Sequence, residues 1–131
     1  MTADDRIDIH ELIALHGHLA DDRRHDELAD LLTADASYDI TAYGMGVVSG
    51  LAALTDLFRA RPGDQPIGHH VTNVLITAGD ANNAHVRSKG LSVMADGTTS
   101  TVIYDDLVTK TPAGWRIAAR TVLPARADPA T

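Results

Sequence analysis

Two adjacent histidines, His69 and His70, open an apolar segment that runs to Ile76. The segment is typical of a β-strand, in which neighbouring side chains point to opposite faces. One imidazole must therefore point into the interior, and we expect it to be His70. An imidazole has an unperturbed pKa of about 6.5, so in an apolar cavity it can donate or accept a proton near neutral pH. The competing interpretation is a structural or exposed histidine at the start of a strand.

Strand alternation places further side chains beside His70. If His70 points inward, so do Thr72, Val74 and Ile76, while the intervening residues point outward. Both faces then carry apolar residues, which predicts that the outer face is also covered. We therefore expect a homodimer.

A later strand adds two polar candidates, Tyr104 and Asp106, which share one face. Tyr104 could donate a hydrogen bond to a substrate oxygen, and Asp106 could adjust a histidine. The alternatives are a packed tyrosine and a surface carboxylate. Tyr38, on an earlier strand, is a further candidate for the pocket wall.

The elements that position these residues follow from the apolar pattern. Ile9, Ile13 and His16 fall on one stripe of an amphipathic helix over about 4–21. The pattern then predicts a short helix at 26–32, a strand at 36–40 and, after a turn at 44–46, a returning strand at 47–48. A third helix follows, capped by Ser49 and stopped by residues 61–64. The rest of the chain is predicted as four strands, at about 69–77, 84–94, 98–110 and 115–123. Short turns between the last four strands demand antiparallel pairing. The fold class is therefore α+β.

Composition narrows the function classes. A chain of 131 residues fits one domain, which we place at 1–123, with a flexible tail at 124–131. The absence of cysteine excludes disulfides, thiolate metal sites and cysteine nucleophiles, and fits a reducing cytoplasm. A net charge of −7 disfavours nucleic acid as a partner. No apolar run approaches the ~18 residues of a membrane span, so we expect no membrane association and a cytoplasmic location.

Several spaced sequence blocks resemble one superfamily. They are Asp5-Arg6-Ile7, Asp21 with residues 26–36, His69 to Asn73, and Tyr104 to Val108 followed by Gly114 to Ile117. With these blocks the chain is similar, over nearly its whole length, to SnoaL-like members of the nuclear-transport-factor-2-like (NTF2-like) superfamily. The resemblance implies a cone in which N-terminal helices pack in a curved, mainly antiparallel sheet that encloses a pocket. Members include polyketide cyclases, scytalone dehydratase, bile-acid dehydratase, ketosteroid isomerase and limonene epoxide hydrolase.

The resemblance also implies site residues. The dehydratases place an aspartate at the end of the first helix, which matches Asp21, and a histidine at the start of the first long strand, which matches His70. His16 stands where a tyrosine is common, and Thr101 stands near the second strand histidine of scytalone dehydratase, so the mechanism can differ. On an ideal helix Asp21 lies about 120° from the apolar stripe. It therefore faces the cavity only if the helix ends there, and is otherwise an exposed loop carboxylate.

Metal and nucleotide chemistry are not expected. His69 and His70 cannot both point at one ion from a regular strand, so we predict no metal. The glycines at 44 and 46 lack the third glycine of a dinucleotide-binding loop, so we predict no cofactor. Arg87-Ser88-Lys89 departs from the Arg-x-Asp motif of the epoxide hydrolases, which disfavours that activity.

The sequence therefore predicts a cofactor-independent acid–base enzyme, a hydro-lyase, isomerase or cyclase, acting on a small apolar cyclic carbonyl compound. His70 is the predicted base and Asp21 its acid–base partner, while His16 and Tyr104 polarise or orient the substrate. The predicted substrate contacts are Ile13, Tyr38, Thr72, Val74, Ile76 and Asp106. The alternative is a small-molecule-binding or assembly module of the same fold without turnover.

Overall fold

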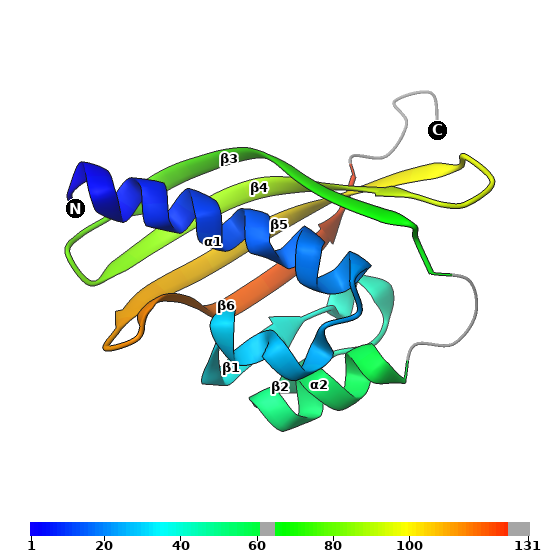
Figure 1. The fold of residues 1–131 in the computed structure, drawn as a ribbon, viewed down its shortest axis with the longest axis horizontal. Coiled ribbons are helices and arrows are strands. Elements are labelled where there is room, and N and C mark those ends of the chain that lie inside the picture. Colours follow the sequence, from blue (N-terminus) through cyan, green and yellow to red (C-terminus); the bar gives the residue numbers. More distant parts are fainter. Residues whose placement is uncertain (61–64, 126–131) are drawn as a thin grey trace.

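The computed structural model describes residues 1–60 and 65–125 of the chain, and within them a long helix lies across one face of a curved, open sheet (Figure 1). The elements are α1 (Ala3–Asp21), the 3₁₀ helix η1 (His25–Asp30), β1 (Leu32–Asp39), the 3₁₀ helix η2 (Thr41–Tyr43), β2 (Val47–Ser49), α2 (Leu51–Arg59), β3 (Gly68–Gly79), β4 (Asn83–Val93), β5 (Thr99–Thr111) and β6 (Gly114–Pro124). The strand order is β2-β1-β6-β5-β4-β3. β1 pairs with β6 in parallel, and the other described pairings are antiparallel. The α+β class expected from the sequence is confirmed.

Some predicted boundaries are wrong. The strand expected at 36–40 already begins at Leu32, and the second helix is a 3₁₀ helix. Ser49 does not cap α2, because it is the last residue of β2, where it pairs with Ser37. The N-cap is Gly50, at φ 94°, and no side chain of a described residue caps this helix. The predicted stop at 61–64 lies outside the described residues. The predicted tail covers 124–131, but Pro124 is the last residue of β6, and residues 126–131 lie outside the described part of the chain.

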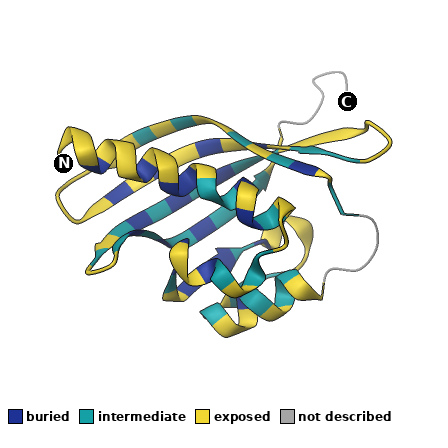
Figure 2. Cartoon of the chain, in the orientation of Figure 1, coloured by how far each residue is buried: buried dark blue, intermediate teal, exposed yellow. Residues whose placement is uncertain are grey.

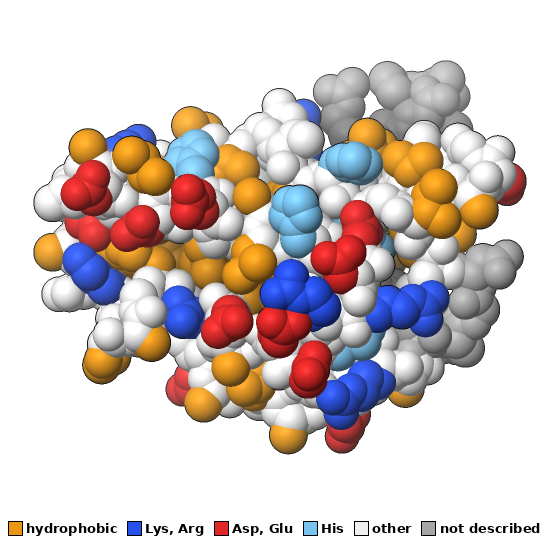
Figure 3. Space-filling model, in the orientation of Figure 1, with side chains coloured by type: hydrophobic (Ala, Val, Ile, Leu, Met, Phe, Trp, Pro, Cys, Tyr) orange, Lys and Arg blue, Asp and Glu red, His pale blue; other side chains and the backbone are white. Residues whose placement is uncertain are grey.

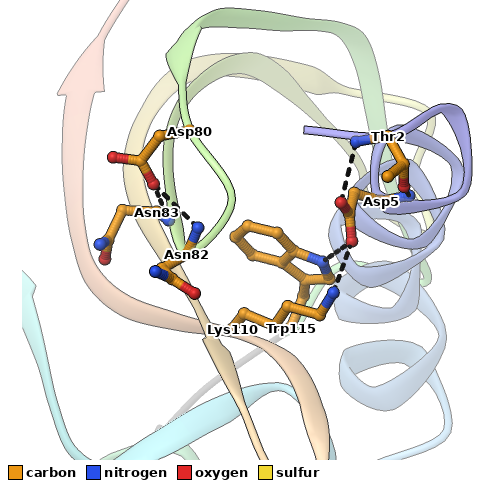
Figure 4. A network of polar contacts seen from close by, with 7 residues as sticks. All are labelled: Thr2, Asp5, Asp80, Asn82, Asn83, Lys110 and Trp115. Atoms are coloured by element: carbon orange, nitrogen blue, oxygen red, sulfur yellow. Dashed lines mark hydrogen bonds and ion pairs between the residues drawn. The ribbon is translucent and has the colours of Figure 1, made fainter.

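Asp5 connects the N-terminus of α1 to the sheet through hydrogen bonds (Figure 4). Thr2 and Asp5 form a capping box, in which each side chain accepts a hydrogen bond from the backbone N–H of the other. The Oδ1 atom of Asp5 also accepts hydrogen bonds from Trp115 Nε1 at 3.1 Å and from Lys110 Nζ at 2.9 Å. These contacts hold the pKa of Asp5 well below its usual range: the Thr2 backbone contributes most, followed by Lys110 and Trp115.

The apolar core fills the space between α1 and the sheet, and the buried positions of both face one another (Figure 2). Ile9 and Ile13 on α1 are fully buried, as are Val108 and Ile117 on β5 and β6. Burial of each such side chain contributes about 1.5–3 kcal/mol relative to exposure. Trp115 is 3% exposed and belongs to this core. The core therefore fixes the face that α1 presents to the sheet.

A β-bulge interrupts β3 at Asn73, which has φ 56°. Thr72 pairs with Lys89 and Leu75 with Arg87, so β3 carries one more residue than β4 across this interval. Asparagine is one of the few residues that adopt this left-handed conformation readily. The extra residue shifts the inward-facing set by one position: Val71 packs on the core before the bulge, and Val74 and Ile76 pack on it afterwards.

Acidic and basic side chains are interspersed over the face of the molecule drawn in Figure 3. None of the helices within 1–60 and 65–125 is both long enough and apolar enough to cross a membrane. Those same residues contain no group of three or more His, Asp or Glu side chains placed to hold a metal ion.

Candidate functional site

The site begins where α1 ends, at Asp21. The helix stops at this residue, so its side chain can reach the start of β3. Asp21 Oδ1 lies 2.7 Å from Nδ1 of His69, and the backbone N–H of His69 donates to both carboxylate oxygens at 2.9 and 3.1 Å. The two side chains are 28% and 16% exposed, so a small molecule can reach the pair. The sequence predicted His70 as the partner of Asp21, and the structure places His69 there instead.

The carboxylate determines how His69 can act. An ionised carboxylate only accepts hydrogen bonds, so the 2.7 Å contact places a proton on His69 Nδ1. In the neutral ring the lone pair is then on Nε2, and that nitrogen can accept a proton. Asp21 also stabilises the imidazolium that would form. The pair therefore has the geometry of an oriented general base.

The orientation predicted for the histidine doublet is wrong. His70 is exposed, and His69 is the ring that turns toward Asp21. The prediction started from an inward-facing His70 and continued the alternation to Val74 and Ile76 as in a regular strand, but the bulge at Asn73 shifts the alternation by one residue. Thr72 is exposed for the same reason.

His16 lies beside this pair on the preceding turns of α1. Its ring centroid is 6.3 Å from that of His69 in an edge-on arrangement, and 5.5 Å from that of Tyr104. Its Nδ1 lies 3.0 Å from Nη1 of Arg120. The structure thus brings together three of the predicted residues, namely His16, Asp21 and Tyr104.

Arg120 is the site residue that the sequence reasoning missed. It is 1% exposed and forms a bidentate ion pair with Asp106, at 2.7 and 2.8 Å. The two residues are register partners on β6 and β5, and Tyr38 on β1 is the partner of Arg120 on its other side. Burial lowers the pKa of the Arg120 guanidinium, but Asp106 outweighs burial and raises it overall. Asp106 is therefore a buried partner of a cation, not a surface carboxylate.

Tyrosine rings surround this ion pair. The guanidinium carbon of Arg120 lies 4.1 Å from the ring centroid of Tyr104 and 5.8 Å from that of Tyr38. Burial raises the pKa of Tyr38 to about 12. Within residues 1–60 and 65–125, two buried hydroxyls, Tyr38 Oη and Ser88 Oγ, have no hydrogen-bond partner. Both hydroxyls are hydrogen-bond donors and acceptors in the interior of the fold.

The remaining predicted contacts divide between the core and the surface. Ile13 is fully buried, and Val74 and Ile76 pack partly buried against the core. A hollow of about 250 Å³ between α1 and β3 is lined by Asp21, His69, His70 and Thr72 among others, and by none of those three apolar residues. Its volume is below that of a typical ligand pocket, about 300–1,000 Å³. Another hollow, of about 430 Å³, lies between α1, η1 and the β5–β6 turn, and its lining contains none of the predicted site residues.

Comparison with known families identifies the fold family. The model of the SnoaL-like domain matches residues 1–121. Among curated sequences, an uncharacterized protein of Mycobacterium tuberculosis is 29% identical over 122 residues, which cover 88% of this chain and 82% of that protein.

Solved structures agree with this match. A candidate aromatic ring hydroxylase from Novosphingobium aromaticivorans is 25% identical with a TM-score of 0.83, covering 97% of this chain and 93% of that one. A candidate scytalone dehydratase from the same organism is 21% identical with a TM-score of 0.77, covering 95% and 89%. LinA is 19% identical with a TM-score of 0.75, covering 98% and 100%. The last two likenesses concern the fold alone, and a fold of this kind hosts many chemistries.

Proposed function

The chain belongs to the SnoaL-like domain family, and we propose that it is a cofactor-independent acid–base enzyme acting on a small, largely apolar cyclic carbonyl compound. The reaction is a dehydration, an isomerisation or a cyclisation. The observation that carries the proposal is the 2.7 Å contact between Asp21 and His69, which leaves the Nε2 atom of His69 as a base at the edge of a small hollow.

The proposed first step is proton abstraction next to the carbonyl. His69 Nε2 removes a proton from the carbon α to the carbonyl group, and the electron pair of the broken C–H bond moves onto the carbonyl oxygen as an enolate. Asp21 stabilises the resulting imidazolium. The imidazolium then returns the proton to another carbon, which gives an isomer, or to a departing β-hydroxyl, which gives water and an enone. Each route restores the starting state of the dyad.

Two features favour this chemistry over that of a purely structural ion pair. Asp21 and His69 remain partly exposed beside the hollow, whereas the structural pair Arg120–Asp106 is fully buried. The buried hydroxyls of Tyr38 and Ser88 could bind substrate oxygens. Val71, which packs against the core and lines the hollow, supplies apolar surface for the ring.

The test is hydrogen exchange into small cyclic ketones. Wild-type protein is incubated with 2-cyclohexen-1-one and cyclohexanone in D₂O, and loss of the α and γ proton signals is followed by NMR. His69→Gln is expected to lower the rate by about 100-fold or more, because it removes the base. His85→Gln, at an exposed histidine of β4 that does not line the hollow, is the matched control and should stay within about twofold of wild type, well below the ~10²-fold effect of losing a general base. Equal rates in the wild type and His69→Gln would contradict the role of His69.

The second candidate, a binding module without turnover, is favoured by the interior ion pair, because Arg120 and Asp106 are fully buried and satisfy one another. It predicts that the same ketones perturb the His69 resonances on titration while no exchange is catalysed.

The homodimer expected from the sequence stays a prediction. Leu75 on the edge strand β3 and Leu91 on the neighbouring strand β4 are 60% and 39% exposed, and sedimentation velocity would decide the oligomeric state.

A further inference from the structure

Two imidazoles lie close together in this site, and each has a different charged partner at Nδ1. His69 faces the carboxylate of Asp21 at 2.7 Å, and His16 faces the guanidinium of Arg120 at 3.0 Å. The ring centroids are 6.3 Å apart. The two rings are therefore close neighbours, one on α1 and the other on β3.

The chemistry of the partners determines where the protons are. A carboxylate accepts hydrogen bonds, so Nδ1 of His69 carries a hydrogen. A guanidinium has five N–H donors and no acceptor, so Nδ1 of His16 must accept, and the hydrogen of its neutral ring is on Nε2. A hydrogen on Nδ1 of His16 would set two donors against each other at 3.0 Å. The neighbouring groups thus require opposite tautomers.

Arg120 is held firmly enough to impose this choice. Asp106 binds it through two hydrogen bonds, both side chains are fully buried, and the ring of Tyr104 lies 4.1 Å from the guanidinium carbon. The guanidinium therefore cannot rotate away without breaking a buried ion pair.

We infer that Arg120 is a positioning residue that makes His16 a hydrogen-bond donor through Nε2, so that the site pairs a base, His69, with a donor, His16. The tautomer of His16 follows from its contact with Arg120 alone, whereas its role as a donor to substrate rests on the proposed function. In that function His16 would donate to the carbonyl oxygen on which the enolate charge develops. A preorganised donor at such an oxygen is among the largest contributions to catalysis. The class of substrate is therefore one with an oxygen acceptor close to the acidic C–H.

The experiment reads the tautomers directly in the intact protein. Wild-type protein labelled with ¹⁵N-histidine is examined by long-range ¹H–¹⁵N correlation NMR at pH 8, with the two rings assigned from His16→Gln and His69→Gln. His16 should show hydrogen only on Nε2, and His69 only on Nδ1. A His16 ring with hydrogen on Nδ1 would overturn the inference.

Two variants test whether Arg120 is the cause. The double variant Arg120→Met with Asp106→Leu removes both charges and should release His16 to a mixture of tautomers, with His69 unchanged. Arg120→Lys keeps a donor-only cation and should preserve the His16 tautomer. If the double variant keeps hydrogen on Nε2 alone, or the lysine variant moves it to Nδ1, the role of Arg120 is wrong.

The wild-type and lysine spectra keep the inference testable if the double variant does not fold. All spectra are recorded without substrate, so the tautomer result is independent of the exchange assay. A failed exchange assay with the expected tautomers would contradict only the proposed reaction. The reverse outcome, exchange with a Nδ1-protonated His16, would contradict only the role of Arg120.

Discussion

Gly17 on α1 packs directly against the backbone carbonyl of His69 on β3, with so little space that a Cβ atom at Gly17 would overlap the carbonyl oxygen. This approach occurs one turn before Asp21. Because the helix lies so near the strand at Gly17, the carboxylate at the helix end can reach both the backbone N–H and the ring of His69.

Gly17→Ala should therefore separate α1 from β3. On helix propensity alone this change would stabilise the protein by about 1 kcal/mol. The overlap with His69 should reverse the sign and destabilise it by about 1–3 kcal/mol, as in other overpacked sites. Urea denaturation measures the change. His10→Ala, at an exposed position of the same helix, is the control and should be neutral or slightly stabilising. A Gly17→Ala protein more stable than the wild type would show that the packing of α1 against His69 leaves room for a Cβ atom at this position.

Replacing only one partner of the buried pair Arg120–Asp106 should lower the stability of the protein more than replacing both. Arg120→Met leaves the Asp106 carboxylate buried without its cation, and should lower the free energy of unfolding by about 3–5 kcal/mol. Arg120→Met combined with Asp106→Leu should lose much less, because no charge is left unpaired.

An exposed pair on the neighbouring strands provides the control. Arg87 and Asp105 lie 3.3 Å apart and are 49% and 44% exposed, so Arg87→Met should change stability by about 1 kcal/mol or less. Equal losses for Arg87→Met and Arg120→Met in urea denaturation would contradict the contrast between the two pairs.

The left-handed backbone conformation of Asn73 predicts which substitutions at this position lower the stability of the protein. Its φ of 56° is strained for most L-residues by about 1–2 kcal/mol, and glycine has no such strain. Asn73→Val should therefore destabilise the protein by about that amount, while Asn73→Gly should remain within about 0.5 kcal/mol of wild type. Thermal or urea unfolding of the two variants checks the order, and a valine variant as stable as the glycine variant would be inconsistent with a left-handed residue here.

Asp5 should make the protein sensitive to acid. Its pKa is lowered in the folded state below the ordinary value of 3.8, so its contribution to stability is present above that value and is lost as the pH falls through the folded pKa. Asp5→Asn should lower the Tm at pH 7 and flatten the fall in Tm below about pH 4–5, where carboxylates that are stabilised in the folded state become protonated. Asp4→Asn removes the same charge from the same turn and is the matched control. Parallel curves for Asp5→Asn and the wild type would contradict this linkage.

Much of the architecture could be predicted from apolar periodicity. The long strands from β3 to β6 lie within a few residues of their predicted ranges, because short turns between alternating segments leave little choice of pairing. The family resemblance assigned Asp21 to the site, whereas the pattern alone left an exposed loop carboxylate as an equal alternative; α1 does end at this residue.

Side-chain direction was predictable only where strands are regular. Trp115 and Ile117 face the core, so in a regular strand the side chain of Ala119 would do so too and that of Arg120 would point outward. Arg120 is nevertheless buried. The register passes from Val108–Ile117 to Leu107–Ala119, so β6 has one extra residue at this point. The same kind of interruption at Asn73 reversed His69 and His70. A polar asparagine within an apolar strand was the signal for the first bulge, whereas the alanines at 118 and 119 give none.

The direction of the histidine doublet is set on the side of the bulge that precedes Asn73, where His69 is paired with Ser92 of β4. Two residues of β3, at 73 and 74, lie between the partners of Lys89 and Arg87, so losing one of them would leave a continuous ladder with every earlier pairing unchanged. A one-residue deletion at this point should therefore keep His69 turned to Asp21, whereas a deletion between the doublet and the bulge would change which of the two rings faces the carboxylate.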